Sequence, residues 1–336
     1  MPGQAPEARR QEQQKGKNML RAMDSAVAGL RAHQNKLDVI GNNIANVNTF
    51  GFKSQNYSFK EAMYQTSTAS TGGTTEAAGN NAAQYGYGTM TGSISMDMAD
   101  GTPSYTGGFN ATINGPGFFV VSSSKNAVTN DDTLKSADCY FSRVGQFSID
   151  SQGYIVDSDN NFVLGFAEDT ATAGSYETDE LVALRLPKSD GTASSDTDTA
   201  ADLAVASSVE INNMGIVTAK ITVKVTTGTP PVDKEEVKTV TLGKIAVASF
   251  PNPEGLTKAG SYYYTTNTSD NAGNCVAAEP GSGSTSSLMT GYLEASNVDL
   301  AKEFSDLITT QRGFQANSKI ITVSDEILNE LVNMKR

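Results

Sequence analysis

The last forty residues carry the most regular hydrophobic pattern in the chain. One line of side chains recurs every seven residues: Leu300, Leu307, Phe314, Ile321 and Leu328. A second line, beside the first, begins at Phe304 and ends at Val332 but holds Gln311, Ser318 and Asp325 between them. A repeat of seven residues over this length is typical of a coiled-coil seam. Because the seam is only half apolar, we expect this helix to pack among several neighbours.

The start of this helix is predicted from its polar residues. Ser296 and Asp299 have the spacing of a capping box, in which each side chain bonds to a backbone N–H of the first turn. Asn297 offers an alternative cap.

A second amphipathic helix is predicted near the N-terminus. Its apolar residues follow spacings of three and four: Leu20, Met23, Val27 and Leu30, then Leu37, Ile40, Ile44 and Val47. The pair Asn48–Thr49 followed by Gly51 predicts its end. Each of the two helices lacks a partner inside its own segment, so we expect them to pair with each other. The alternative is two independent surface helices of one globular domain, for which such regular heptads are unnecessary.

The middle of the chain alternates between short apolar runs and polar turns, which is typical of antiparallel hairpins. The runs predict strands at Gly92–Met98, Asn110–Val121, Tyr140–Ile149, Tyr154–Phe166, Ser208–Ile211, Ile216–Val225, Val237–Leu242 and Ile245–Phe250. The expected fold class is therefore mainly β with α-helical terminal arms, the two arms forming a coiled-coil-like axial region around an inserted antiparallel β-domain.

Four kinds of segment follow from these patterns. Residues 1–18 are expected to be a disordered N-terminal extension, and 19–53 with 296–336 an axial helical domain. Residues 54–84 are expected to be a linker or hinge, since 66–84 hold few bulky apolar groups. Residues 85–295 form the inner β-domain, with a polar insertion near 168–206. Helical arms that bring both termini to one end suit a polymerising subunit.

Charge narrows the range of partners. The formal net charge is −12, which argues against nucleic acid and anionic lipid as partners. No apolar run approaches the roughly 18–20 residues that a membrane-spanning helix needs. The first 18 residues hold no apolar core of the kind that a secretory signal peptide requires.

The histidine and cysteine residues of the chain give little indication of catalytic or redox chemistry. His33 is the one histidine of the chain, and we expect it to be a solvent-facing or interfacial helix residue. Cys139 and Cys275 have no metal-binding spacing; one disulfide, two free thiols or a crosslink between subunits all remain open. We expect no catalytic residue, no cofactor and no small-molecule substrate.

One acidic segment resembles a calcium-binding loop. Asp157, Asp159, Asn161 and Glu168 have EF-hand spacing, but Phe162 stands where that loop needs glycine. A hairpin turn, built from Asp and Asn for their turn geometry, is therefore the preferred interpretation, and no metal site is expected.

Two terminal motifs closely resemble the flagellar rod and hook family of axial proteins. They are LDVIGNNIANVNTFGFK (37–53) and LEASNVDLAKEFSDLITTQRGFQANSKIITVSDEILNELVNMKR (293–336). Internal pieces such as NGPGFFVV (114–121), FSRVGQFSID (141–150) and GYIVDSDNNFVLGF (153–166) extend the resemblance. Within the family, ILNELVNMKR and the NPEGLTKAG segment favour a hook subunit, of a compact form that lacks a large outer domain. A distal rod subunit is the alternative.

The resemblance implies a structural role in motility. A hook subunit polymerises into a flexible curved tube that joins rod to filament and transmits torque. Its partners would be copies of itself, the distal rod protein, the hook cap and the hook–filament junction proteins. Export would use the flagellar type III apparatus, to an extracellular place on the basal body and hook. The implied assembly interface comprises Leu20, Met23, Val27, Leu30, Leu37, Ile40, Ile44, Leu300, Phe304, Leu307, Phe314, Ile321, Leu328 and Val332.

Overall fold

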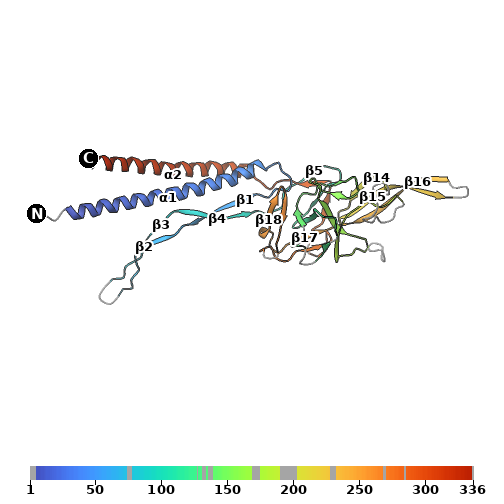
Figure 1. The fold of residues 1–336 in the computed structure, drawn as a ribbon, viewed down its shortest axis with the longest axis horizontal. Helices are drawn as coiled ribbons and strands as arrows, with labels where there is room; N and C mark the ends of the chain where they lie inside the picture. The colour runs from blue at the N-terminus through green and yellow to red at the C-terminus, as the bar shows by residue number, and fades with distance from the viewer. Residues whose placement is uncertain are drawn as a thin grey trace. The chain divides into compact units, whose positions relative to one another are not determined.

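The structure, a computed structural model, divides into two compact units. One contains residues 1–47, 54–97 and 298–336, and the other contains 48–53 and 98–297. The described residues are all except 1–4, 74–77, 127, 131–133, 135–138, 169–174, 190–202, 228–231, 268–269, 284 and 335–336. The chain is mainly β with a long helix at each end (Figure 1), which confirms the expected fold class.

The first unit is built on two antiparallel helices that lie side by side. They are α1 (Ala5–Ala45) and α2 (Leu300–Met334), and the two termini lie at the same end of this unit (Figure 1). Helix α1 begins well before Met19, inside the segment expected to be disordered. That segment is rich in Ala, Glu, Gln, Lys and Arg, which have high helix propensity, although it has no apolar stripe.

The start of α2 differs from the predicted cap by a few residues. The Asp299 carboxylate accepts hydrogen bonds from the N–H groups of Ala301 (2.9 Å) and Lys302 (3.3 Å). Asp299 is therefore the N-cap residue. Asn297 instead donates its side-chain amide to the carbonyl of Ala99.

Much of the expected linker at 54–84 is paired in strands. Strand β1 (Gln55–Glu61) pairs with β4 (Thr89–Met96), and β2 (Tyr64–Thr68) pairs with β3 (Ala83–Gly86). Strands β1 and β4 pack on α1, where the rings of Phe59 and His33 lie 5.3 Å apart. The aromatic residues of QNYSFKE favour a strand, an effect that the polar sequence after it conceals.

The second unit is a β-domain. Its main sheet has the order β14-β15-β16-β12-β7-β9-β19-β18. The strands of this unit, those of the main sheet included, are β5 (Pro103–Tyr105), β6 (Ala111–Ile113), β7 (Phe118–Ser122), β8 (Val128–Thr129), β9 (Cys139–Ser142), β10 (Ser148–Ile149), β11 (Ile155–Val156), β12 (Phe162–Phe166), β13 (Glu180–Ala183), β14 (Ala206–Ile211), β15 (Ile216–Thr227), β16 (Val232–Ile245), β17 (Val247–Ser249), β18 (Thr257–Gly260), β19 (Tyr263–Thr265), β20 (Val276–Ala278), β21 (Leu288–Thr290) and β22 (Tyr292–Glu294).

The core of the β-domain confirms the predicted strands. Inward-facing side chains of β7, β12, β15 and β17 are almost fully buried, among them Phe119, Val163, Val217 and Val247. Within the expected polar insertion, however, β13 pairs with β12, and Leu181 and Leu184 belong to the core. The apolar run in ELVALRL explains this difference. Most of the remaining insertion lies outside the described residues.

The acidic segment at 157–161 is a hairpin turn between β11 and β12, as predicted. The buried Asp157 carboxylate accepts hydrogen bonds from the N–H groups of Asp159 (3.0 Å) and Asn161 (2.9 Å) and from the Tyr263 hydroxyl (2.5 Å). Its lone pairs thus close the turn and anchor it to β19. Cys139 and Cys275 are both buried thiols.

Candidate assembly interface

On α2, most of the expected apolar line is half-buried, and a line of polar residues beside it is more deeply buried. Leu307, Phe314, Ile321 and Leu328 are half-buried. The line beside them consists of Glu303, Thr310, Asn317 and Ser324, of which all but Asn317 are buried. Phe304 and Val332 lie one position further round and are 50% and 66% exposed. The hydrophobic pattern could not predict this buried line, because its residues are polar.

The N-terminal seam residues are distributed over the contact face of α1 and its margins. Ile40 is buried; Met23, Leu30, Leu37 and Ile44 are half-buried. Val27 is exposed, and Leu20 lies in α1 with its side chain outside the described part. The most buried apolar positions of the helix also include the small residues Ala26 and Ala32.

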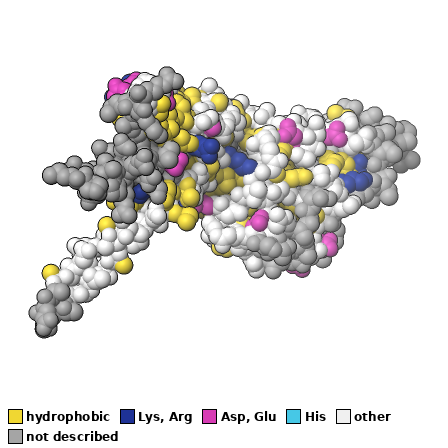
Figure 2. All heavy atoms as spheres, turned by 60° about the vertical axis from the view of Figure 1, so that its left-hand side comes forward, with side chains coloured by type: hydrophobic (Ala, Val, Ile, Leu, Met, Phe, Trp, Pro, Cys, Tyr) yellow, Lys and Arg dark blue, Asp and Glu magenta, His cyan; other side chains and the backbone are white. Residues whose placement is uncertain are grey.

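Large apolar side chains remain uncovered on the helical unit. On α2 they are Leu300, Phe304, Ile308, Ile320, Val323, Ile327 and Val332; on β1 and β4 they are Phe59, Met90 and Ile94. Figure 2 shows that exposed hydrophobic side chains gather in part of the surface rather than spreading evenly. Gathered apolar surface of this kind is typical of sites that bind a protein, a membrane or a ligand.

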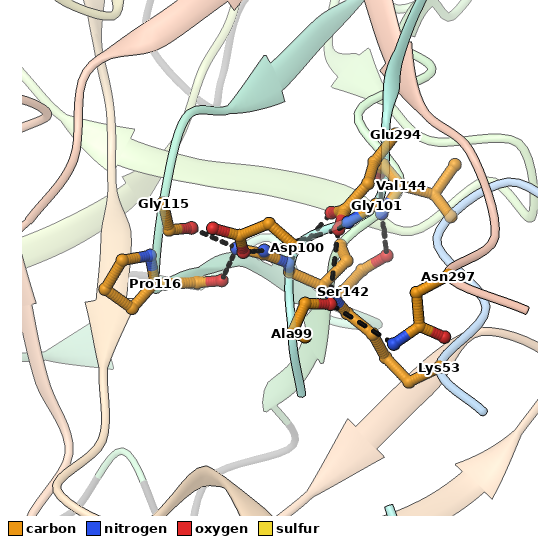
Figure 3. Close-up of polar contacts among 12 residues, drawn as sticks. Lys53, Ala99, Asp100, Gly101, Gly115, Pro116, Ser142, Val144, Glu294 and Asn297 are labelled. Atoms are coloured by element: carbon orange, nitrogen blue, oxygen red, sulfur yellow. Dashed lines mark hydrogen bonds and ion pairs between the residues drawn. The ribbon is translucent and has the colours of Figure 1, made fainter. Parts of the chain in front are cut away.

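A buried charge cluster lies in the β-domain where the chain passes to and from the helices (Figure 3). The Glu294 carboxylate binds the Lys53 ammonium at 2.7 Å and the Arg143 guanidinium at 2.9 Å. All three side chains are at most 3% exposed. Asp100 forms an ion pair with Arg143 from the domain surface. The cluster therefore balances two positive with two negative groups.

Backbone groups complete the cluster. Lys53 also donates to the carbonyl of Ala99 (2.7 Å), and Glu294 accepts from the N–H of Gly101 (2.8 Å). Arg143 donates to the carbonyls of Gly115 and Gly117, both at 2.7 Å. Burial lowers the pKa of Lys53, and Arg143 lowers it further, whereas Glu294 opposes this shift. The cluster fixes segments 48–53 and 294–297 to the β-domain.

Ligand chemistry has no evident place in the described part of the chain. The residues that the structure describes contain no group of three His, Cys, Asp or Glu side chains arranged to hold a metal ion. Across the same residues, neither helix has the length and apolarity needed to cross a membrane. His33, the one histidine, faces Gly313 of α2.

Three family models match the chain in sequence order. The flagella basal body rod protein model matches residues 23–53, and the flagellar hook protein FlgE/F/G D1 domain matches 112–219. The flagellar basal body rod FlgEFG protein C-terminal model matches 289–334. The first and last cover the two helical arms, and the second covers much of the β-domain.

Relatives match almost the whole chain. A flagellar basal-body rod protein FlgG of Bacillus subtilis (strain 168) is 37% identical over 320 residues, covering 95% of this chain and all of the relative. A FlgG rod protein of Caulobacter vibrioides is 29% identical, with 92% and 97% covered. A flagellar hook protein FlgE of Borreliella burgdorferi is 25% identical, with 94% and 100% covered in an alignment of 472 positions.

Proposed function

Because the chain belongs to the flagellar rod and hook family and is a structural subunit of the flagellar axis, we propose that it is a distal rod subunit of the basal body. The observation that carries this proposal is the relationship to the rod protein of Bacillus subtilis, which is 37% identical over 95% of this chain and all of the relative.

The rod is better supported than the hook, which the segments ILNELVNMKR and NPEGLTKAG favoured. The rod relatives align over 320 and 314 positions, whereas the hook relative needs 472 positions against a chain of 336 residues. This chain lacks the extra length that the hook relative carries. The similarity along the chain therefore outweighs these two short segments.

Assembly would use the helical unit. The uncovered apolar side chains of α2 pack against helices of neighbouring copies, and each buried side chain contributes about 1.5–3 kcal/mol. Repeated contacts of two different surfaces extend a helical polymer rather than closing a ring. The partners are copies of this chain and the axial subunits above and below it; the hook cap and junction proteins belonged to the hook interpretation.

The role is mechanical rather than catalytic. The relatives are named as rod and hook proteins, and the buried polar cluster around Glu294 serves to hold backbone segments together. The polymer is a rigid, straight shaft that transmits torque.

The test is electron microscopy of basal bodies from cells in which the gene is deleted. Cells with truncated rods, no hooks and no filaments would support the distal rod. Complete rods that end without hooks would support the hook instead. Intact flagella would contradict both, and a plasmid copy of the gene should restore motility in either supporting case.

A further inference from the structure

Three contacts between α1 and α2 involve a polar side chain that meets a specific partner. A Cβ atom at Gly29 would lie 2.8 Å from the side-chain amide nitrogen of Asn317. A Cβ atom at Gly313 would lie 2.6 Å from the ring of His33. Each glycine therefore provides the space that a larger side chain of the other helix occupies.

The third contact is a buried hydrogen bond. Asn43, which is 1% exposed, donates to the Glu303 carboxylate at 3.1 Å. Asn43 also donates to the carbonyl of Gln55 (2.9 Å) and accepts from its N–H (2.9 Å). Because β1 holds the amide on both sides, Asn43 is fixed before it meets α2.

All three contacts belong to one antiparallel register. His33 lies four residues after Gly29 on α1, and its partner Gly313 lies four residues before Asn317, the partner of Gly29, on α2. From His33 to Asn43 is ten forward, and from Gly313 to Glu303 is ten back. The same alignment therefore satisfies both glycine contacts and the hydrogen bond.

The apolar line cannot define this register. Its members repeat every seven residues, so a slip of one heptad replaces each large apolar side chain by another. The polar contacts do not survive the slip. Asn317 would face Lys36 or Ala22 instead of Gly29, depending on the direction of the slip. His33 would likewise meet a residue with a side chain instead of Gly313.

We propose that His33–Gly313, Asn317–Gly29 and Asn43–Glu303 form a register lock, which selects the helix pair of one subunit over slipped pairs and pairs with neighbouring copies. The lock concerns contacts inside one chain and holds for a rod or a hook. That neighbouring copies offer competing identical helices rests on the proposed function. A single polar residue in a seam is known to set register in this way.

The first experiment is a rescue cycle read by thermal unfolding of the helical circular dichroism signal. Gly41 lies on α1 with open space around it, so Gly41→Ala should raise the midpoint, since Ala favours helix by about 1 kcal/mol over Gly. Gly313→Ala gains the same propensity but displaces the His33 ring, so the midpoint should fall. Adding His33→Ala should return it to the wild-type value or above.

Two outcomes would overturn the lock. In the first, Gly313→Ala raises the midpoint as Gly41→Ala does. In the second, Gly313→Ala lowers the midpoint of the His33→Ala variant by as much as it lowers that of the wild type. If Gly313→Ala does not fold, the cycle of Gly29→Ala with Asn317→Ala decides the question by the same criteria.

The second experiment measures which helices pair. Lys36 and Thr310 lie opposite each other midway between the Asn43 and Gly29 contacts, so Lys36→Cys with Thr310→Cys should give a crosslink within one chain under oxidation. The parent chain, with its buried Cys139 and Cys275, measures the background. Adding His33→Ala and Asn317→Ala should raise the share of crosslinks between chains several-fold. An unchanged share would contradict the lock, whereas failure of the parent to polymerise would count against the proposed function alone.

Discussion

At the scale of single residues, the most constrained group is the Glu294 carboxylate. It receives two buried cations and a backbone N–H within the β-domain. The motif ends GFK and LEASN include Lys53 and Glu294, so the resemblance marked both residues. No local pattern could predict that they touch each other, because 241 positions separate them, or that Arg143 joins them.

Replacing Glu294 by Gln should make the β-domain unfold at a lower concentration of denaturant. The change removes the one carboxylate that faces both Lys53 and Arg143, and leaves only the partly exposed Asp100 beside Arg143. Breaking a buried ion pair in this way costs roughly 3–5 kcal/mol in comparable cases. Chemical denaturation measures the loss. The matched control is Glu210→Gln, which breaks a 2.8 Å ion pair with Lys220 that is largely exposed; no measurable change is expected there. Equal stability of the two variants would refute the role of the cluster.

The stability of the helical unit should depend on the charge of His33. Burial lowers the pKa of His33 below its ordinary value of 6.5, and the nearby Lys36 lowers it further. As the pH falls, His33 is therefore protonated in the unfolded chain at a higher pH than in the folded chain. Stability from this group is complete above pH 6.5 and is lost as the pH falls from there through the lowered folded-state pKa.

Thermal unfolding between pH 7.5 and 5 measures this loss, and His33→Gln is the control. Since the chain has one histidine, that variant should remove the loss in this range. Burial raises the pKa of Glu303, so its protonation at lower pH acts in the opposite direction and persists in the variant. A wild-type midpoint that rises steadily as the pH falls below 6.5 would contradict the burial of a neutral imidazole.

At the scale of elements, the heptad pattern located α2, because a repeat of seven leaves a clear apolar signature. It misplaced the second line, because Glu303, Thr310 and Ser324 are polar although they are buried. It also missed the role of Gly29 and Gly313, since glycine in a helix looks only unfavourable until the facing side chain is known. The strand β1 was missed because its neighbours are polar.

The exposed apolar face of α2 should matter for polymerisation and not for the fold. Ile308 and Ile327 are 52% and 42% exposed, so Ile308→Asn with Ile327→Asn should leave the unfolding free energy nearly unchanged. If neighbouring copies cover both side chains, the losses of about 1.5–3 kcal/mol each should raise the critical concentration for polymerisation more than tenfold. Sedimentation of polymers measures this.

The matched control for this face is Thr309→Asn, an exposed polar position on the same helix. It should polymerise as the wild type does. Polymerisation of the double variant at the wild-type critical concentration would show that the face lies outside the interface.

At the scale of the whole molecule, the order of helix, β-domain and helix could be predicted because each part has its own periodicity. The division of the chain into units could not. The helical unit also takes in 54–97, which the sequence split between a linker and the β-domain, because packing of strands on α1 depends on contacts that no local pattern records. The choice between rod and hook likewise needed whole-chain comparison, since both share the terminal motifs.

The most direct test of the central claim, that this chain is a rod subunit assembling through its helices, is cryo-electron microscopy of polymers grown from the purified protein. We expect straight tubes in which α1 and α2 form the innermost layer and the exposed face of α2 contacts neighbouring copies. Curved tubes would return the hook to first place. Tubes lined by the β-domain, with the α2 face open to solvent, would contradict the account.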